Sequence, residues 1–273
     1  MKITISFFFL FFLFVVSVPA QDTEQIFQKA FSDLKAKDYT ACATGFNAYL
    51  AKAPKDYGAH YNLGLCYAGL EKKNDAISAY REAIRLKPDY YEAYVQLGNH
   101  LDDLGKYDEA VAAYQSAIKI NPNNFSAYSE LGIAHNRAKK WDDGEKAYLQ
   151  ALKIKPDDGP SNLGLGNTYY NTKQYARAIA PYKKAAELDP QNITARVFLA
   201  DSYYALKEYV TAIASYNIAL GLDSNNANAI YGLGITYIGQ RKLTLAQQQQ
   251  QKLSGINGDL AAKLQQLIKD AKP

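Results

Sequence analysis

The sequence contains few of the residues from which metal sites are built. Its 273 residues include only two cysteines and three histidines. The histidines, His60, His100 and His135, lie far apart and share no metal-ligand spacing with a cysteine or a carboxylate. The sequence therefore predicts no metal site.

An excess of charge of one sign is missing as well. The chain has 31 Lys and Arg residues against 27 Asp and Glu residues, a formal net charge of +4 that is scattered along the sequence. Proteins that bind nucleic acid gather basic residues on one face. We therefore predict no nucleic-acid partner.

Motifs of nucleotide binding and catalysis are also missing. The Gly-x-Gly pairs at 164–166 and 232–234 follow no predicted strand and do not complete the glycine-rich phosphate-binding pattern. No Ser, Cys or Lys lies in a nucleophile-and-base motif. Asp102 and Asp103 with Glu130 could form an acid–base pair, but we interpret them as solvated charges that contact a ligand. We predict neither a catalytic residue nor a cofactor.

A long apolar run lies at the N-terminus. Residues 1–20 have the positive charge of Lys2 near their start and small residues around Ala20 at their end. This pattern is typical of a signal peptide that is cleaved before Gln21. The apolar segment is short for a membrane span, which needs about 20 residues. No cysteine follows it to carry a lipid anchor. We predict a periplasmic or secreted protein, with membrane contact only if the leader stays uncleaved.

The sequence is rich in tyrosine, with 23 residues, and has a 34-residue period. We number the positions of a 34-residue frame that starts at Thr23 as slots 1 to 34. Slots 8 and 20 hold small residues in all seven copies, and slot 32 holds proline in most of them. Slot 24 holds Phe46, Tyr80, Tyr114, Tyr148, Tyr182 and Tyr216. Self-similarity at a fixed period of this length indicates an array of stacked units.

Each copy has the pattern of two helices joined by a turn. Slots 4, 7, 8 and 11 follow the spacing of one helix face, and slots 17, 20, 24 and 27 form a second such face. In the copy at 91–124, Gly105 follows the first helix, where a left-handed residue can end it, and Pro122 stops the second. Small residues at slots 8 and 20 let the two helices approach closely, and the tyrosines fill the space beside them.

This pattern resembles the tetratricopeptide repeat family over about residues 23–256. The resemblance implies an all-α, right-handed solenoid of about seven helical hairpins, whose first helices line a concave groove. The predicted repeats, within 21–256, are 23–56, 57–90, 91–124, 125–158, 159–192, 193–226 and 227–256. Residues 257–273, with Leu260, Leu264, Leu267 and Ile268 on one helical face, are predicted to form a C-terminal capping helix and tail.

In this family, slots 5, 6, 9, 12 and 13 of the first helices line the groove. Here these slots vary between copies and are rich in amides, which donate and accept hydrogen bonds, and in tyrosine, which offers a stiff contact surface. The alternative is a solvated helix face. The candidate groove residues are Tyr61, Asn62, Gln96, Asn99, Asp102, Glu130, Asn136, Arg137, Asn167, Tyr170, Asn171, Asp201 and Tyr204.

These features predict a non-enzymatic scaffold that binds a protein or peptide, and no small-molecule substrate, in its groove. The alternative is an accessory subunit that recruits substrate to a separately encoded envelope enzyme or assembly machine. Folding and binding should use different slots. Leu97→Asp should therefore unravel neighbouring repeats, whereas a substitution of Asn99 should weaken the partner and leave stability within about 0.5 kcal/mol.

The two cysteines, Cys42 and Cys66, lie on consecutive predicted helices that should pack together. An exported compartment permits a disulfide between them. A disulfide also needs Cα atoms within about 7 Å and correctly aimed side chains. We favour two buried free thiols, with the disulfide as the alternative.

The fifth copy has local features that should weaken it. Pro181 falls inside its second helix, at a cost of about 3 kcal/mol in an ordinary helix. Gly164 and Gly166 each weaken its first helix by about 1 kcal/mol relative to alanine. We predict a bend in the second helix, and lower stability here than in the second to fourth copies.

Overall fold

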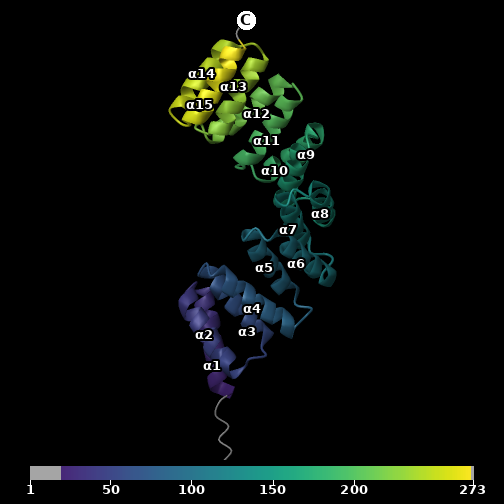
Figure 1. The fold of residues 1–273 in the computed structure, drawn as a ribbon, viewed down its shortest axis with the longest axis vertical. Helices are drawn as coiled ribbons and strands as arrows, with labels where there is room; N and C mark the ends of the chain where they lie inside the picture. Colours follow the sequence, from purple (N-terminus) through teal and green to yellow (C-terminus); the bar gives the residue numbers. More distant parts are fainter. Residues whose placement is uncertain (1–19, 272–273) are drawn as a thin grey trace, which may run out of the picture. The chain divides into compact units, whose positions relative to one another are not determined.

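The computed structural model describes residues 20–271, and over this range the regular structure is entirely helical. The predicted leader lies outside the described residues, apart from Ala20 at the start of the first helix. The helices, drawn in Figure 1, are α1 (Ala20–Lys35), α2 (Tyr39–Lys52), α3 (Tyr57–Gly69), α4 (Lys73–Leu86), α5 (Tyr91–Asp103), α6 (Tyr107–Ile120), α7 (Phe125–Arg137), α8 (Trp141–Ile154), α9 (Gly159–Asn171), α10 (Tyr175–Leu188), α11 (Ile193–Ala205), α12 (Tyr209–Leu222), α13 (Ala227–Gly239), α14 (Leu243–Ser254) and α15 (Gly258–Asp270). None of these helices is long and apolar enough to cross a membrane.

Consecutive helices pack in pairs, α1 with α2, α3 with α4, and so on to α13 with α14. Each of the 34-residue copies contains one such pair. The all-α fold of repeated helical hairpins, followed by a capping helix, is confirmed.

The chain divides into two units. The first ends at Asp89 and contains α1 to α4, and the second begins at Tyr90 and contains α5 to α15. At slot 34, the first helices α3, α7, α9, α11 and α13 have an Asp or Asn whose side chain accepts a hydrogen bond from a backbone N–H. Tyr90 occupies this slot before α5 and makes no side-chain capping bond. The boundary between the units therefore lies directly before α5, the first helix of the third repeat, which lacks the N-cap that these other helices share.

Close contact between a glycine and a tyrosine holds the two helices of a repeat together. A Cβ atom built on Gly98 would lie 2.6 Å from Cε1 of Tyr114, which is too close for a real contact. Gly64, Gly132 and Gly166 meet the slot-24 tyrosine of their own repeats in the same way. These tyrosines are fully buried, so the predicted roles of slots 8 and 24 are confirmed.

The turn inside each repeat has one left-handed residue at slot 15. Gly105 has φ +73°, as the sequence indicated. The backbone N–H of the following residue, Lys106, then donates to the carbonyl of Leu101, which closes the end of α5. In the other copies the left-handed residues are Lys37, Glu71, Lys139, Lys173, Lys207 and Arg241, so this turn does not depend on glycine.

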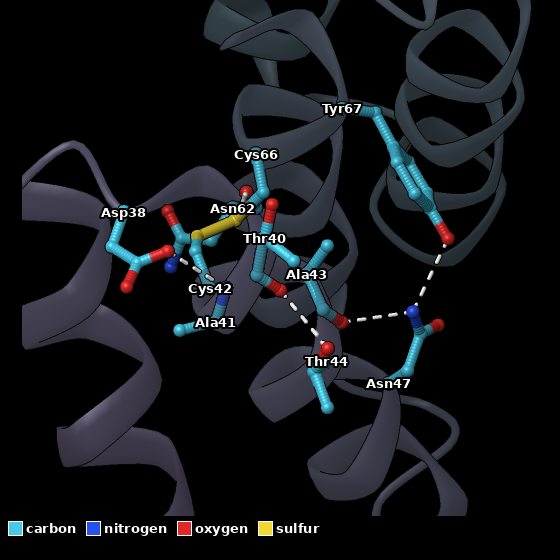
Figure 2. The surroundings of a disulfide bond; sticks show 10 residues. All are labelled: Asp38, Thr40, Ala41, Cys42, Ala43, Thr44, Asn47, Asn62, Cys66 and Tyr67. Atoms are coloured by element: carbon cyan, nitrogen blue, oxygen red, sulfur yellow. Dashed lines mark hydrogen bonds between the residues drawn. A yellow bond between two sulfur atoms is a disulfide. The ribbon is translucent and has the colours of Figure 1, made fainter. Parts of the chain in front are cut away.

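The expectation of two free thiols is wrong, because Cys42 and Cys66 form a disulfide between α2 and α3 (Figure 2). Their Cα atoms lie 5.9 Å apart, within the range that a disulfide needs. Both residues are fully buried in the core of the first unit. The bond covalently joins the first repeat to the second.

Pro181 is buried inside α10, and the helix continues through it from Tyr175 to Leu188. The predicted bend and lower stability of this repeat stay predictions. The two glycines of α9 have a packing role. A Cβ atom on Gly164 would lie 2.3 Å from the ring of Tyr148, and one on Gly166 would lie 2.5 Å from the ring of Tyr182.

The last helix, α15, covers the open face of the final repeat. Leu264 and Ile268 are buried in a cluster with residues of α13 and α14. A Cβ atom on Gly234 of α13 would lie 2.5 Å from Leu264. Leu267 is an exception to the predicted apolar face, because it is 41% exposed.

Candidate ligand-binding groove

The predicted groove residues divide between the two units. Tyr61 and Asn62 belong to α3 in the first unit, where both are half-buried and the ring of Tyr61 lies 5.8 Å from that of Tyr80. The remaining candidates belong to α5, α7, α9 and α11 of the second unit. We therefore describe the binding surface within the second unit.

The larger pocket of the second unit lies on the first helices α9, α11 and α13, and we call it the α11 pocket. Its volume is about 610 Å³, within the range of small-ligand sites. Aromatic and apolar side chains dominate its lining, and Asp201 is the charged residue among them. Its lining includes Tyr170, Val197, Phe198, Asp201, Tyr204 and Tyr231.

A second pocket of about 470 Å³ lies beside it, and we call it the α9 pocket. It is formed mainly by α7 and α9, with Trp141 and Tyr148 contributed by α8. Phe198 lines both pockets, and its ring stacks on that of Tyr182 at 5.7 Å. The lining of the α9 pocket includes Asn136, Arg137, Trp141, Tyr148, Asn167 and Asn171.

In three repeats, slot 9 provides the acceptor for the buried tyrosine of slot 24. The hydroxyl of Tyr114 donates to Oδ1 of Asn99 at 2.7 Å, and that of Tyr182 donates to Oδ1 of Asn167 at 2.9 Å. In the next repeat Asp201 replaces the asparagine and accepts from the hydroxyl of Tyr216. Three of the predicted groove residues therefore stabilise the inside of their own repeats.

This finding corrects the expectation that a substitution of Asn99 would hardly change stability. Tyr114 is only 1% exposed, so its hydroxyl would lose its acceptor inside the protein. A buried donor without a partner costs about 1–3 kcal/mol.

Asp201 differs from the asparagines by its charge. Burial raises the pKa of its carboxyl to about 6, although the hydrogen bond from Tyr216 opposes the shift. No ion pair to Asp201 is present among the residues that the structure describes.

Asp102 is not the solvated charge that the sequence suggested. It is buried, and Oδ2 of its carboxylate forms an ion pair with Nη1 of Arg137, whose side chain is about half exposed. Burial raises the pKa of Asp102, and the charge of Arg137 opposes this effect. Burial also raises the pKa of Glu130, with a smaller contribution from the charge of Asp102. Asp102 therefore serves to hold Arg137 in place and is unavailable to a ligand.

A family model described as the C-terminal domain of cilia and flagella-associated protein 70, a tetratricopeptide repeat domain, matches residues 27–230. The chain belongs to this tetratricopeptide repeat family. No curated protein matches its sequence.

Solved structures of tetratricopeptide repeat proteins share the fold. A protein from Parabacteroides merdae aligns with a TM-score of 0.66 and 17% identity, over 91% of this chain and 99% of its own. YrrB, described as having an unusual peptide-binding site, aligns with a TM-score of 0.62 and 20% identity, over 70% of this chain and 99% of its own. MamA aligns with a TM-score of 0.59 and 23% identity, over 64% of this chain and 96% of its own.

Several predicted residues of this tetratricopeptide repeat protein do lie at the two pockets. Arg137, Asn167 and Asn171 line the α9 pocket, and Tyr170 and Tyr204 line the α11 pocket.

Asn136 also lines the α9 pocket, but its amide joins α7 to α9. Its Nδ2 donates to Oγ1 of Thr168 at 2.9 Å. Gln96, Asn99, Asp102 and Glu130 line neither pocket.

Sequence reasoning missed four aromatic residues of these pockets, among them Tyr148, whose slot 24 was assigned to packing. Phe198 and Tyr231 occupy slots 6 and 5, which the groove rule already included, so extending the rule to every copy would have found them. Trp141 occupies slot 17, which was assigned to packing between the helices of a repeat. Among the described residues, no group of three or more His, Cys, Asp or Glu side chains could hold a metal ion.

Proposed function

We propose that this protein is an exported, non-enzymatic scaffold that binds a peptide or protein segment along α7, α9, α11 and α13. The observation that carries the proposal is the pair of pockets that share Phe198 as a common wall. A segment lying across Phe198 could insert one side chain into each pocket. Affinity and side-chain specificity would then come from two neighbouring sites on one surface of the second unit.

The chemistry of the lining supports a peptide ligand. Tyr170 and Tyr204 are half-buried, so they present a fixed aromatic surface with a polar tip. Asn171 is exposed at the edge of the α9 pocket, where its amide can reach the backbone of a bound segment. Aromatic residues with a few polar groups are typical of interface hot spots.

Export rests on the leader pattern of residues 1–20. It is tested by mass spectrometry of the native protein, which should show a mature N-terminus at Gln21. Retention of Met1 would instead support a membrane anchor.

Affinity capture with the full chain tests the binding surface. Asn171→Ala should lose a protein that the wild-type chain captures from envelope extracts, while its thermal unfolding stays close to that of the wild type. Tyr204→Ala should lose the same protein and also unfold at a lower temperature, because Tyr204 packs against the buried cluster around Val197. Val210→Ala is the matched control. Val210 lies on α12, the second helix of the sixth repeat, where it is 76% exposed and lines neither pocket. If the captured protein is kept by both pocket variants and lost by the control, the wrong surface has been assigned.

A further inference from the structure

Slot 9 shows that the charge of Asp201 is not needed for the fold. The structure uses the same hydrogen bond in three repeats, from a buried tyrosine hydroxyl to a slot-9 oxygen. Asn99 and Asn167 supply that oxygen from a neutral amide. Asp201 supplies it from a carboxylate, which is more costly to bury. The charge of Asp201 is therefore additional to its role as an acceptor.

The surroundings of Asp201 make this charge available to a ligand. Asp201 lines the α11 pocket, where no other lining residue is ionised at neutral pH. Its hydrogen bond to Tyr216 uses Oδ1, and Oδ2 makes no hydrogen bond to the described residues. A carboxylate in a largely apolar pocket attracts a cation more strongly than it would in water.

The walls of the pocket also suit a cation. Tyr170, Phe198, Tyr204 and Tyr231 line it from three successive first helices. Aromatic faces attract an ammonium or guanidinium group within about 6 Å of the ring centre. They also pack against the aliphatic stem of a lysine or arginine side chain. The pocket thus pairs a carboxylate with aromatic walls.

We propose that the α11 pocket binds a lysine or arginine side chain of the partner segment, with Asp201 as the counter-charge. This inference rests on the proposed function and specifies the residue that the groove selects. The α9 pocket differs in charge, because it has the neutral Asn167 at slot 9 and no carboxylate in its lining, and because Arg137 at its edge is paired with Asp102. The basic residue of the partner therefore belongs in the α11 pocket and not in its neighbour.

The test is selection from a random octapeptide phage library on immobilised full-length protein. Peptides selected by the wild type should share a Lys or Arg at one position. Asp201→Asn should bind synthetic versions of them at least about tenfold more weakly, as expected for removing one partner of a desolvated ion pair. Replacing the peptide arginine by citrulline, or the lysine by norleucine, should weaken peptide binding to the wild type by the same factor as Asp201→Asn does. The same replacement should weaken binding to the Asp201→Asn variant much less.

Asp201→Asn should keep the hydrogen bond that the fold uses at slot 9. Asp201→Asn recreates the asparagine–tyrosine pair of the third and fifth repeats, so its thermal unfolding should occur at or above the wild-type temperature. Asn99→Asp is the reciprocal control, because it places a carboxylate at the same slot of the third repeat, where slot 9 lines neither pocket. It should leave the preference for a basic residue in the α11 pocket unchanged.

The outcomes separate this inference from the proposed function. Selected peptides without a shared basic residue, or peptides that bind Asp201→Asn as tightly as the wild type, would overturn the inference and leave groove binding intact. If no peptide is selected whose binding depends on Tyr204, the groove itself is not a peptide site. The proposed function then fails, and the inference fails with it.

Discussion

The hydrogen bond between Tyr114 and Asn99 offers a sharp test of how the repeats are stabilised. Asn99→Ala removes the acceptor of a hydroxyl that lies inside the third repeat, at 2.7 Å from Oδ1. The side chain of Tyr114 is 1% exposed, and Asn99 is the one hydrogen-bond partner of its hydroxyl among the described residues. We expect the free energy of unfolding to fall by about 1–3 kcal/mol.

A double-mutant cycle separates the hydrogen bond from other effects of the substitution. Tyr114→Phe leaves Asn99 half-buried, where its amide can bind water, so it should cost less, about 0.5–1.5 kcal/mol. The double variant should be more stable than the sum of the two losses predicts, by about 1 kcal/mol. Tyr148→Phe is the matched control, because its repeat has Ile133 at slot 9 and its ring lines the α9 pocket. That variant should change stability by less than about 0.5 kcal/mol.

The measurement is urea unfolding followed by circular dichroism, with hydrogen exchange of α5 and α6 to show that the loss is local. The exchange data matter because repeats can unfold separately, which would make a single transition hard to interpret. An Asn99→Ala variant within 0.5 kcal/mol of the wild type would refute the structural role of slot 9. Strict additivity of the two substitutions would refute it as well.

Three further predictions concern Asp201, the disulfide and the glycine contacts. The raised pKa of Asp201, about 6 against 3.8, means that its carboxylate destabilises the fold as the pH rises through this interval. Asp201→Asn should therefore unfold at higher urea than the wild type at pH 7, and the difference should disappear below about pH 4. Reducing the bond between Cys42 and Cys66 should cost about 3 kcal/mol in the first unit, and a thiol assay of the unreduced, denatured protein should find no free thiol. Gly98→Ala should lower the free energy of unfolding in urea by about 2 kcal/mol or more, because the new Cβ would lie 2.6 Å from the buried ring of Tyr114. This loss should exceed the gain of about 1 kcal/mol that alanine brings to a helix. A urea midpoint equal to or higher than that of the wild type would contradict the contact.

The fold was predictable because the contacts that build it recur at fixed positions. Every copy needs a small residue at slot 8 and, in most copies, a tyrosine at slot 24, and the structure shows the two in direct contact within a repeat. A requirement repeated seven times is visible in a single sequence. Even the break between the units has a sequence signal, since Tyr90 replaces the Asp or Asn of slot 34.

The binding surface was only partly predictable, because its residues do not repeat. Tyr170, Tyr204 and Arg137 were found from their slots, whereas Trp141 lies at a slot that elsewhere serves packing. The disulfide was missed for a similar reason. Whether two cysteines meet depends on Cα separation and side-chain direction, which periodicity alone does not fix.

Slot 9 shows why the separation of folding slots from binding slots does not hold at every position. Its side chain points inward to a buried tyrosine and, in Asp201, also lines a pocket. The hydrogen bond requires only an acceptor, which Asn and Asp both provide, so the fold does not depend on the charge at this slot. Removal of the side chain would therefore damage both roles at once and could not tell them apart. An exchange of carboxylate for amide keeps the acceptor and changes the charge alone, so at this position charge, and not location, separates binding from stability.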